Sequence, residues 1–170
     1  MTVIKVNRPH DQGLIQEVPL MNAQALEDIL SKAHRLFLNT EQWLPAYERI
    51  EILERVAQIM TEQVDKLTKI AAQEGGKPYQ DSKVEVLRAV NGVKLAIEYM
   101  SHIKGEQIPM GHTRSSSQRL AYTMREPIGL VASVSAFNHP LNLTVHQTVP
   151  AIAVGSPVII KPAKVTPLSC

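Results

Sequence analysis

The residue types best suited to ligand chemistry gather in two short segments near the C-terminal end of the sequence. Asn138 closely follows the apolar run 129–135, and Lys161 and Lys164 lie at the end of the apolar run 157–161 and just after it. Ligands of parallel sheets bind beyond the carboxyl ends of the strands. If both runs are parallel strands, an amide and two cations meet at one edge, which suits a phosphate-bearing small molecule. Ordinary loop polarity explains the same three residues equally well.

The elements around these residues indicate a βαβ unit. Segment 140–154 has the length of a helix, and Gly155 after it is a common helix stop. A strand, a helix and a strand in this order imply a parallel pair joined by a right-handed crossover. Pro150 inside the helix removes one backbone hydrogen bond and predicts a kink. Two parallel strands alone leave faces and edges uncovered, so an incomplete fold is expected.

The chain before these strands is predicted to be mainly helical. Asn22 can cap a first helix, whose apolar residues recur at helical spacing. A second helical stretch starts at Pro45 and stops at Gly75, with a bend expected near Thr61 because the run is long for one helix. A third helix covers about 82–100.

Two segments have extended character. Residues 3–19 read as an extended lead-in punctuated by prolines and a glycine. Residues 105–126 contain a run of three serines followed by alternating polar and apolar residues. This pattern predicts a hairpin that is too polar on both sides to lie in a core.

Composition and charge argue against several classes of function. The 170 residues carry 18 Lys and Arg against 16 Asp and Glu, and aromatic residues make up 4%. So few aromatics argue against a nucleic-acid partner, because such proteins stack bases on aromatic rings. No apolar run has the length of a membrane span, so no membrane partner is expected. Basic residues predominate after position 100, which favours an anionic ligand, although a solvated basic face is the commoner cause.

The sequence lacks the usual metal and nucleotide motifs. It contains no P-loop, no G-x-G-x-x-G and no paired cysteines, and its six histidines lack metal-ligand spacing. No metal site is therefore expected. Cys170 is the only cysteine and cannot form an internal disulfide, so a reducing compartment, the cytoplasm, is expected.

Four ordered motifs resemble a known family. They are REPIG at 125–129, AFNHPL at 136–141, PAIAVG at 150–155 and KPAKVTP at 161–167, and the turn EGGKP at 74–78 agrees with them. Together they resemble the N-terminal portion of the NAD(P)-dependent aldehyde dehydrogenase superfamily over nearly the whole chain. The second motif is similar to the branch that includes phosphonoacetaldehyde and lactaldehyde dehydrogenases.

The resemblance implies an incomplete α/β fold, with N-terminal helices plus the first βαβ unit of a Rossmann-like cofactor domain. Residues 1–104 would be the helical part of the cofactor-binding domain. Residues 105–126 would be one arm of an oligomerisation hairpin, and 127–170 the βαβ unit of the NAD(P)-binding sheet, without a catalytic domain. A homo-oligomer, dimer or tetramer, is implied for the full-length protein.

The resemblance also implies roles for individual residues. Asn138 stands where the family's side-chain oxyanion donor lies, so its carboxamide would stabilise the charge that develops on an aldehyde oxygen. The alternative is an asparagine that caps the following helix. The residues expected to contact the cofactor, NAD or NADP, are Ser135, Ala136, Phe137, Asn138, Lys161, Ala163 and Lys164.

Three residues depart from the family pattern. Lys164 replaces a glutamate that accepts hydrogen bonds from ribose hydroxyls in NAD-preferring members. Lysine cannot accept such bonds but attracts a 2′-phosphate, which predicts that NADP is tolerated or preferred. Ala136 replaces a proline, and His139 replaces an aromatic residue. His139 beside Asn138 would suit an anionic aldehyde, although a simple helix-start histidine explains it too.

The implied reaction is oxidation of a small aldehyde to a carboxylic acid through a cysteine thiohemiacetal and thioester. The family's nucleophilic cysteine and glutamate base would lie beyond Cys170. Neither Cys170 nor Glu74 stands at their positions, so the 170-residue chain alone is expected to be inactive. The alternative is a non-catalytic standalone fragment that binds nucleotide weakly or associates through its hairpin.

Overall fold

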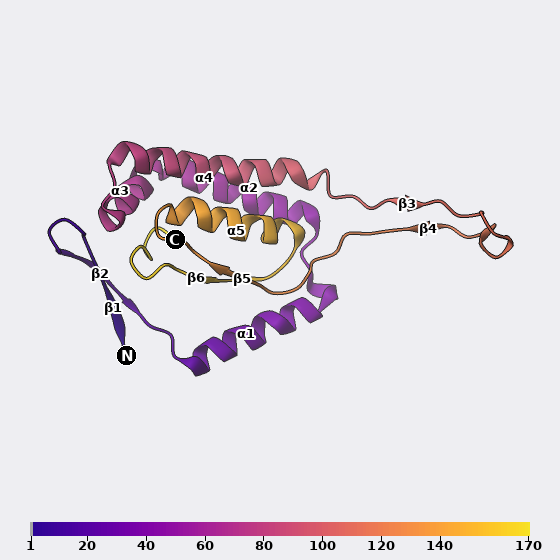
Figure 1. The fold of residues 1–170 in the computed structure, drawn as a ribbon, viewed down its shortest axis with the longest axis horizontal. Helices are drawn as coiled ribbons and strands as arrows, with labels where there is room; N and C mark the ends of the chain where they lie inside the picture. The colour runs from indigo at the N-terminus through magenta and orange to yellow at the C-terminus, as the bar shows by residue number, and fades with distance from the viewer. Residues whose placement is uncertain (1) are drawn as a thin grey trace.

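A computed structural model describes residues 2–170 as helices joined to three two-stranded sheets (Figure 1). The strands and helices follow in the order β1 (Val3–Asn7), β2 (Leu14–Pro19), α1 (Ala23–Leu38), α2 (Ala46–Glu62), α3 (Val64–Gly75), α4 (Tyr79–Met100), β3 (Gln107–Ile108), β4 (Ala121–Tyr122), β5 (Val131–Val134), α5 (Pro140–Val154) and β6 (Val158–Lys161). Short 3-10 helices lie at Thr40–Gln42 and Arg114–Ser116.

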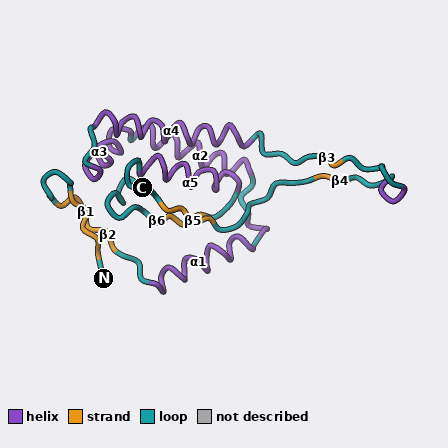
Figure 2. Tube along the Cα trace, in the orientation of Figure 1, coloured by secondary structure: helices purple, strands orange, loops and turns teal. Residues whose placement is uncertain are grey.

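The main core lies between α2, α4 and α5. Apolar side chains three or four residues apart place one stripe of each helix toward the others. The buried cluster consists of Leu53, Ala57 and Met60 from α2, Val86, Ala89, Val90 and Val93 from α4, and Leu141, Val145, Val149 and Ala153 from α5. The long helix α4 contacts α2, α3 and α5 and runs along the upper edge of the helices in Figure 2.

The predicted helices are confirmed, with small changes at their ends. The Asn22 side chain accepts a hydrogen bond from the backbone N–H of Ala25 at 2.8 Å and caps α1. The predicted bend near Thr61 is a break at Gln63, which separates α2 from α3. The third helix begins at Tyr79, three residues before the predicted start, because Pro78 provides the extended residue before its first turn.

The predicted βαβ unit is confirmed. Strands β5 and β6 are parallel and pair from Val131 with Val158 to Val134 with Lys161. The helix α5, which contains Pro150, connects them. The pair lies between α5 and α1 (Figure 1). Helix α1 has no buried residue, and the strand side chains of Val134 and Ile160 are exposed. The strand pair is therefore only partly covered, although parallel sheets are normally covered on both faces.

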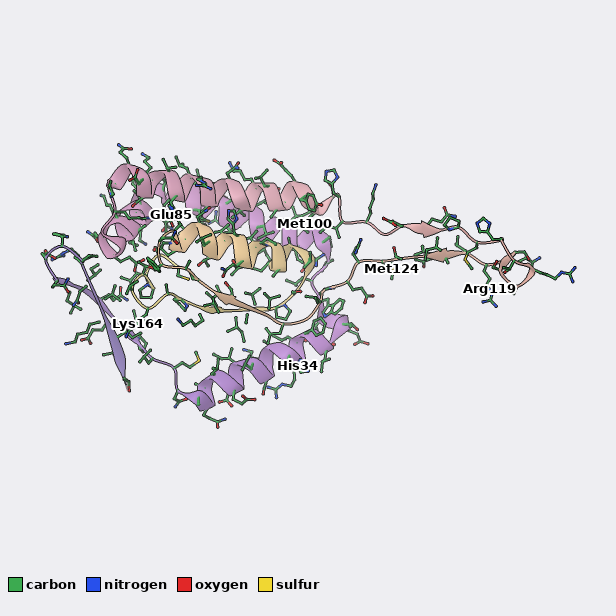
Figure 3. All side chains as sticks on the ribbon, viewed as in Figure 1. His34, Glu85, Met100, Arg119, Met124 and Lys164 are labelled. Carbon is green, nitrogen blue, oxygen red and sulfur yellow. The ribbon has the colours of Figure 1, made fainter. Side chains whose placement is uncertain are left out.

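Both extended segments form antiparallel pairs. The lead-in is the hairpin β1–β2, which the sequence predicted only as extended chain. The predicted hairpin 105–126 is confirmed as a long arm in which β3 and β4 share two residue pairs. The arm projects from the helical layer, and Figure 3 shows Arg119 and Met124 on it, away from α4 and α5.

Gly155 is a glycine whose replacement is expected to harm the fold. It ends α5 with a φ of 91°, and an added Cβ would collide with the Arg49 guanidinium and meet Pro127. Gly155→Ala is therefore expected to lower the free energy of unfolding by about 1–3 kcal/mol. Gly75→Ala is the control, because its Cβ would meet only the flexible Lys77 side chain at 3.6 Å and helix propensity rises. Chemical denaturation that ranks the two variants equally would contradict this assignment.

Candidate functional site

The loops that follow β5 and β6 lie side by side. Val134 pairs with Lys161 in the parallel register, and the Ser135 backbone N–H donates to the Lys161 carbonyl at 3.0 Å. Residues 135–139 and 161–164 therefore leave the sheet at the same carboxyl edge. The structure thus brings the residues predicted from the sequence together, as the parallel topology requires.

These residues differ in what they present to a ligand. Phe137, Asn138, Lys161 and Lys164 are exposed, whereas Ser135 and Ala163 are buried and Ala136 is intermediate. The Ser135 hydroxyl donates within the loop, to the carbonyls of Ala136 and Pro140, and accepts from Thr144 Oγ1 at 3.0 Å. The exposed four can offer side chains, and Ser135 and Ala163 support the loop from inside.

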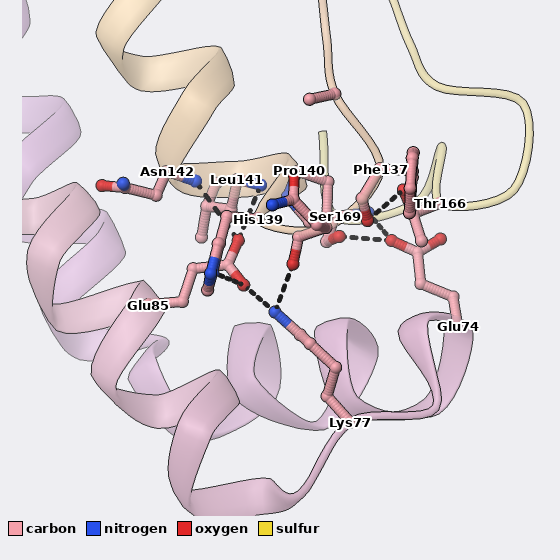
Figure 4. A network of polar contacts seen from close by, with 12 residues as sticks. Glu74, Lys77, Glu85, Phe137, His139, Pro140, Leu141, Asn142, Thr166 and Ser169 are labelled. Atoms are coloured by element: carbon pink, nitrogen blue, oxygen red, sulfur yellow. Dashed lines mark hydrogen bonds and ion pairs between the residues drawn. The ribbon is translucent and has the colours of Figure 1, made fainter.

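The start of α5 is capped from another helix. The cap residue of α5 is His139, and it makes no side-chain capping bond. The alternative in which Asn138 caps the helix is therefore wrong. Glu85 of α4 takes this role, because its Oε1 accepts from the N–H groups of Leu141 at 3.0 Å and Asn142 at 3.3 Å (Figure 4). A carboxylate at a helix N-terminus is stabilised by the unpaired N–H groups and the helix dipole.

Lys77 connects this cap to Asn138. Its Nζ contacts Glu85 Oε2 and donates to the backbone carbonyl of Asn138 at 2.9 Å (Figure 4). His139 Nδ1 lies 3.4 Å from the same Glu85 oxygen. The Glu85 side chain is fully buried, so the nearby ammonium offsets the cost of removing its charge from water.

Glu74 makes a second link between distant segments. It accepts from the N–H groups of Leu168 and Ser169, each at 2.8 Å, and also contacts the Ser169 hydroxyl. Burial raises the pKa of Glu74 above its usual range, although these hydrogen bonds act in the opposite direction. Glu74 therefore holds the segment after β6, which agrees with the expectation that it is not a catalytic base.

Lys77 and Glu85 are the residues at this site that sequence reasoning missed. The sequence motif at 74–78 contains Lys77 but predicted no role for its side chain. A usable signal existed for Glu85, because it is an acidic residue of the third predicted helix that directly precedes the apolar Val86. A carboxylate in such a place requires a partner, but its partners lie 8 and 56 residues away in the sequence.

The arrangement limits where an anionic ligand can bind. The N–H groups at the start of α5 already face the Glu85 carboxylate, so a phosphate there would meet a negative charge. Lys161 and Lys164, by contrast, are exposed on the neighbouring loop, and no acidic side chain within residues 2–170 forms an ion pair with either. A phosphate-bearing ligand thus fits the lysine loop rather than the helix N-terminus.

A groove of about 960 Å³ runs between α4 and α5. Its lining is mostly apolar and carries three titratable side chains, Arg88, Tyr99 and His146. On the side of α5 it is lined from Val145 onward, after the first turn of the helix. Over residues 2–170 no cluster of side chains could hold a metal ion, and none of the described helices is long and apolar enough to cross a membrane.

Comparison with known proteins identifies relatives that share this sequence pattern and this fold. The chain is 33% identical over 165 residues to a lactaldehyde dehydrogenase of Methanocaldococcus jannaschii, covering 97% of the chain and 34% of that protein. Aldehyde dehydrogenase 21 of Physcomitrella patens, solved with its product succinate, superposes with a TM-score of 0.93 at 32% identity, over 99% of this chain and 35% of that one. A glyceraldehyde-3-phosphate dehydrogenase of Methanocaldococcus jannaschii with NADP gives 0.89 at 33% identity, over 98% and 35%.

The chain thus spans about a third of the length of the relatives it matches, and its fold is that of their N-terminal part. The lactaldehyde dehydrogenase match agrees with the branch that the second motif indicated. The model of the aldehyde dehydrogenase family matches residues 1–170, the whole of the sequence. The chain belongs to the aldehyde dehydrogenase family.

Proposed function

We propose that the chain is the cofactor-binding side of an enzyme that oxidises an aldehyde to a carboxylic acid with NAD+ or NADP+. The observation that carries the proposal is that the backbone of Asn138 is held in place while its side chain is exposed. Its backbone is anchored by Lys77 while its carboxamide is exposed and, within residues 2–170, makes no hydrogen bond. A donor held in this way is available to an oxygen that becomes negatively charged as a nucleophile attacks an aldehyde.

The remaining groups of the reaction would come from elsewhere in the protein. Cys170 Sγ forms a hydrogen bond of 2.9 Å with Thr144 Oγ1 of α5, which supports a structural role for this cysteine. We expect the nucleophilic cysteine and the glutamate base to follow Cys170, and the 170-residue chain alone to be inactive. The carbon chain of the aldehyde would lie in the groove between α4 and α5.

Reading the coding frame beyond Cys170 tests this proposal against its alternative. A continuation that contains a cysteine and a glutamate-glycine-glycine turn supports the enzyme. An immediate stop codon supports the standalone fragment, which would bind nucleotide weakly or associate through the hairpin 105–126. The exposed apolar residues of this arm, Ile108, Leu120, Tyr122 and Met124, suit association between copies of the chain as a dimer or tetramer.

The exposed lysines of the β6 loop fit a nucleotide cofactor. Lys161 and Lys164 would face its ribose and phosphate, and backbone groups of 135–137 would line the neighbouring loop. When bound, the nicotinamide supplies the hydride acceptor. The charge of Lys164 favours a 2′-phosphate, so NADP is the preferred form in this proposal.

Lys164→Glu is expected to lower the affinity for NADP relative to NAD by about 10–100-fold, because a charge-assisted contact worth about 1.5–3 kcal/mol is lost. Fluorescence titration of the two cofactors measures the ratio. Lys66→Glu makes the same charge change on the exposed face of α3 and should leave the ratio unaltered. An unchanged ratio in Lys164→Glu would remove Lys164 from the cofactor site.

A further inference from the structure

We propose that Lys77 and Glu85 act as positioning residues that fix Asn138 for the proposed reaction. The inference rests on the proposed function, because it explains how one carboxamide is aimed at a reacting oxygen. The loop 135–139 has no regular secondary structure, and no side chain of its own caps α5. Its conformation must therefore be imposed by other elements.

Both peptide groups that flank Asn138 are held. Thr166 Oγ1 donates to the Phe137 carbonyl at 3.2 Å, and Lys77 Nζ donates to the Asn138 carbonyl at 2.9 Å. These carbonyls belong to the peptide planes before and after the Asn138 Cα. Because the planes on both sides of a Cα determine its φ and ψ, the two bonds together set the direction of the Cα–Cβ bond. The carboxamide is left free for a ligand.

Thr166 and Lys77, which bind the two carbonyls around Asn138, form a clamp on this residue. Glu85 makes the clamp rigid by using both carboxylate oxygens. Oε1 accepts from the first N–H groups of α5, and Oε2 faces Lys77 and His139. The same side chain thus fixes the helix that follows Asn138 and the ammonium that holds its carbonyl. The Lys77 side chain is only 20% exposed, so its rotamers are restricted by the packing around it.

A double-mutant cycle in the polypeptide encoded by the complete reading frame tests the inference. Lys77→Met removes the ammonium, and we expect kcat to fall about 10–100-fold, as for a misplaced catalytic group, while the KM of the cofactor changes less than about twofold. Lys77→Met combined with Asn138→Ala should be no slower than Asn138→Ala alone, because the clamp acts only through Asn138. Lys77→Arg should recover part of the loss.

Two further variants keep the test decisive if Lys77→Met unfolds. Thr166→Val removes the other anchor without leaving a buried charge and should lower kcat about 3–10-fold, again without adding to Asn138→Ala. Lys66→Met, an exposed lysine of α3, is the control and should match the wild type. Hydrogen exchange of segment 136–142 should rise in Lys77→Met and Thr166→Val only.

The outcomes separate the inference from the proposed function. If Asn138→Ala leaves kcat unchanged, the proposed function fails. If Asn138→Ala lowers kcat but the Lys77 and Thr166 variants do not, or their losses add to it, the proposed function stands and the positioning role is overturned.

Discussion

Asn138→Ala is expected to lower kcat for aldehyde oxidation by about 10²–10³-fold in the polypeptide of the complete reading frame, the usual cost of removing one oxyanion donor. The carboxamide is exposed and lacks an intramolecular partner within residues 2–170, so its loss should leave the fold intact. The KM of the cofactor should change little, because the donor acts on the oxygen of the reacting aldehyde.

Steady-state kinetics and thermal unfolding on the same preparations measure this effect. Asn39→Ala changes another exposed asparagine far from the β5–α5 loop and serves as the control. A kcat within about threefold of wild type for Asn138→Ala would show that the carboxamide has no part in the chemistry.

Glu85→Ala is expected to have the largest effect on stability. It removes a fully buried carboxylate, leaves the first N–H groups of α5 unpaired and leaves Lys77 without its counter-charge. Breaking a buried ion pair in this way costs about 3–5 kcal/mol in the free energy of unfolding. Glu85→Gln keeps an acceptor for the α5 amides and should lose less.

Denaturant titration of the two variants checks this expectation. Glu54→Ala on the exposed side of α2 is the matched control and should stay within about 0.5 kcal/mol of wild type. A loss of less than about 1 kcal/mol for Glu85→Ala would mean that the cap and the ion pair contribute little to the folded state.

Local signals explain how much of the fold could be predicted. The apolar runs at 129–135 and 157–161, with a helix-length segment and Gly155 between them, were sufficient for the βαβ unit. Asn22 marked the start of α1, and the length of the second helical run indicated its break. The pairing of β1 with β2 was missed, because its short strands have no strong alternation to distinguish them from a loop.

The site was predictable only where it follows from topology. The carboxyl ends of β5 and β6 bring Asn138, Lys161 and Lys164 to one edge, as expected for parallel strands. The clamp on Asn138 was not predictable, because Lys77 and Thr166 reach its loop from 61 residues before and 29 residues after the carbonyls they bind. Glu85 is the exception, because an acidic residue among apolar residues of a predicted helix indicates a buried polar contact.

The most direct test of the account is aldehyde-dependent reduction of NADP+ by the polypeptide of the complete reading frame. The protein is mixed with NADP+ and a panel of short aldehydes, with and without an anionic group, and the reduced cofactor and the acid product are both quantified. The account predicts one carboxylic acid for each reduced cofactor, and no turnover by residues 1–170 alone. A folded, cofactor-binding polypeptide that reduces no NADP+ or NAD+ with any aldehyde of the panel would contradict it.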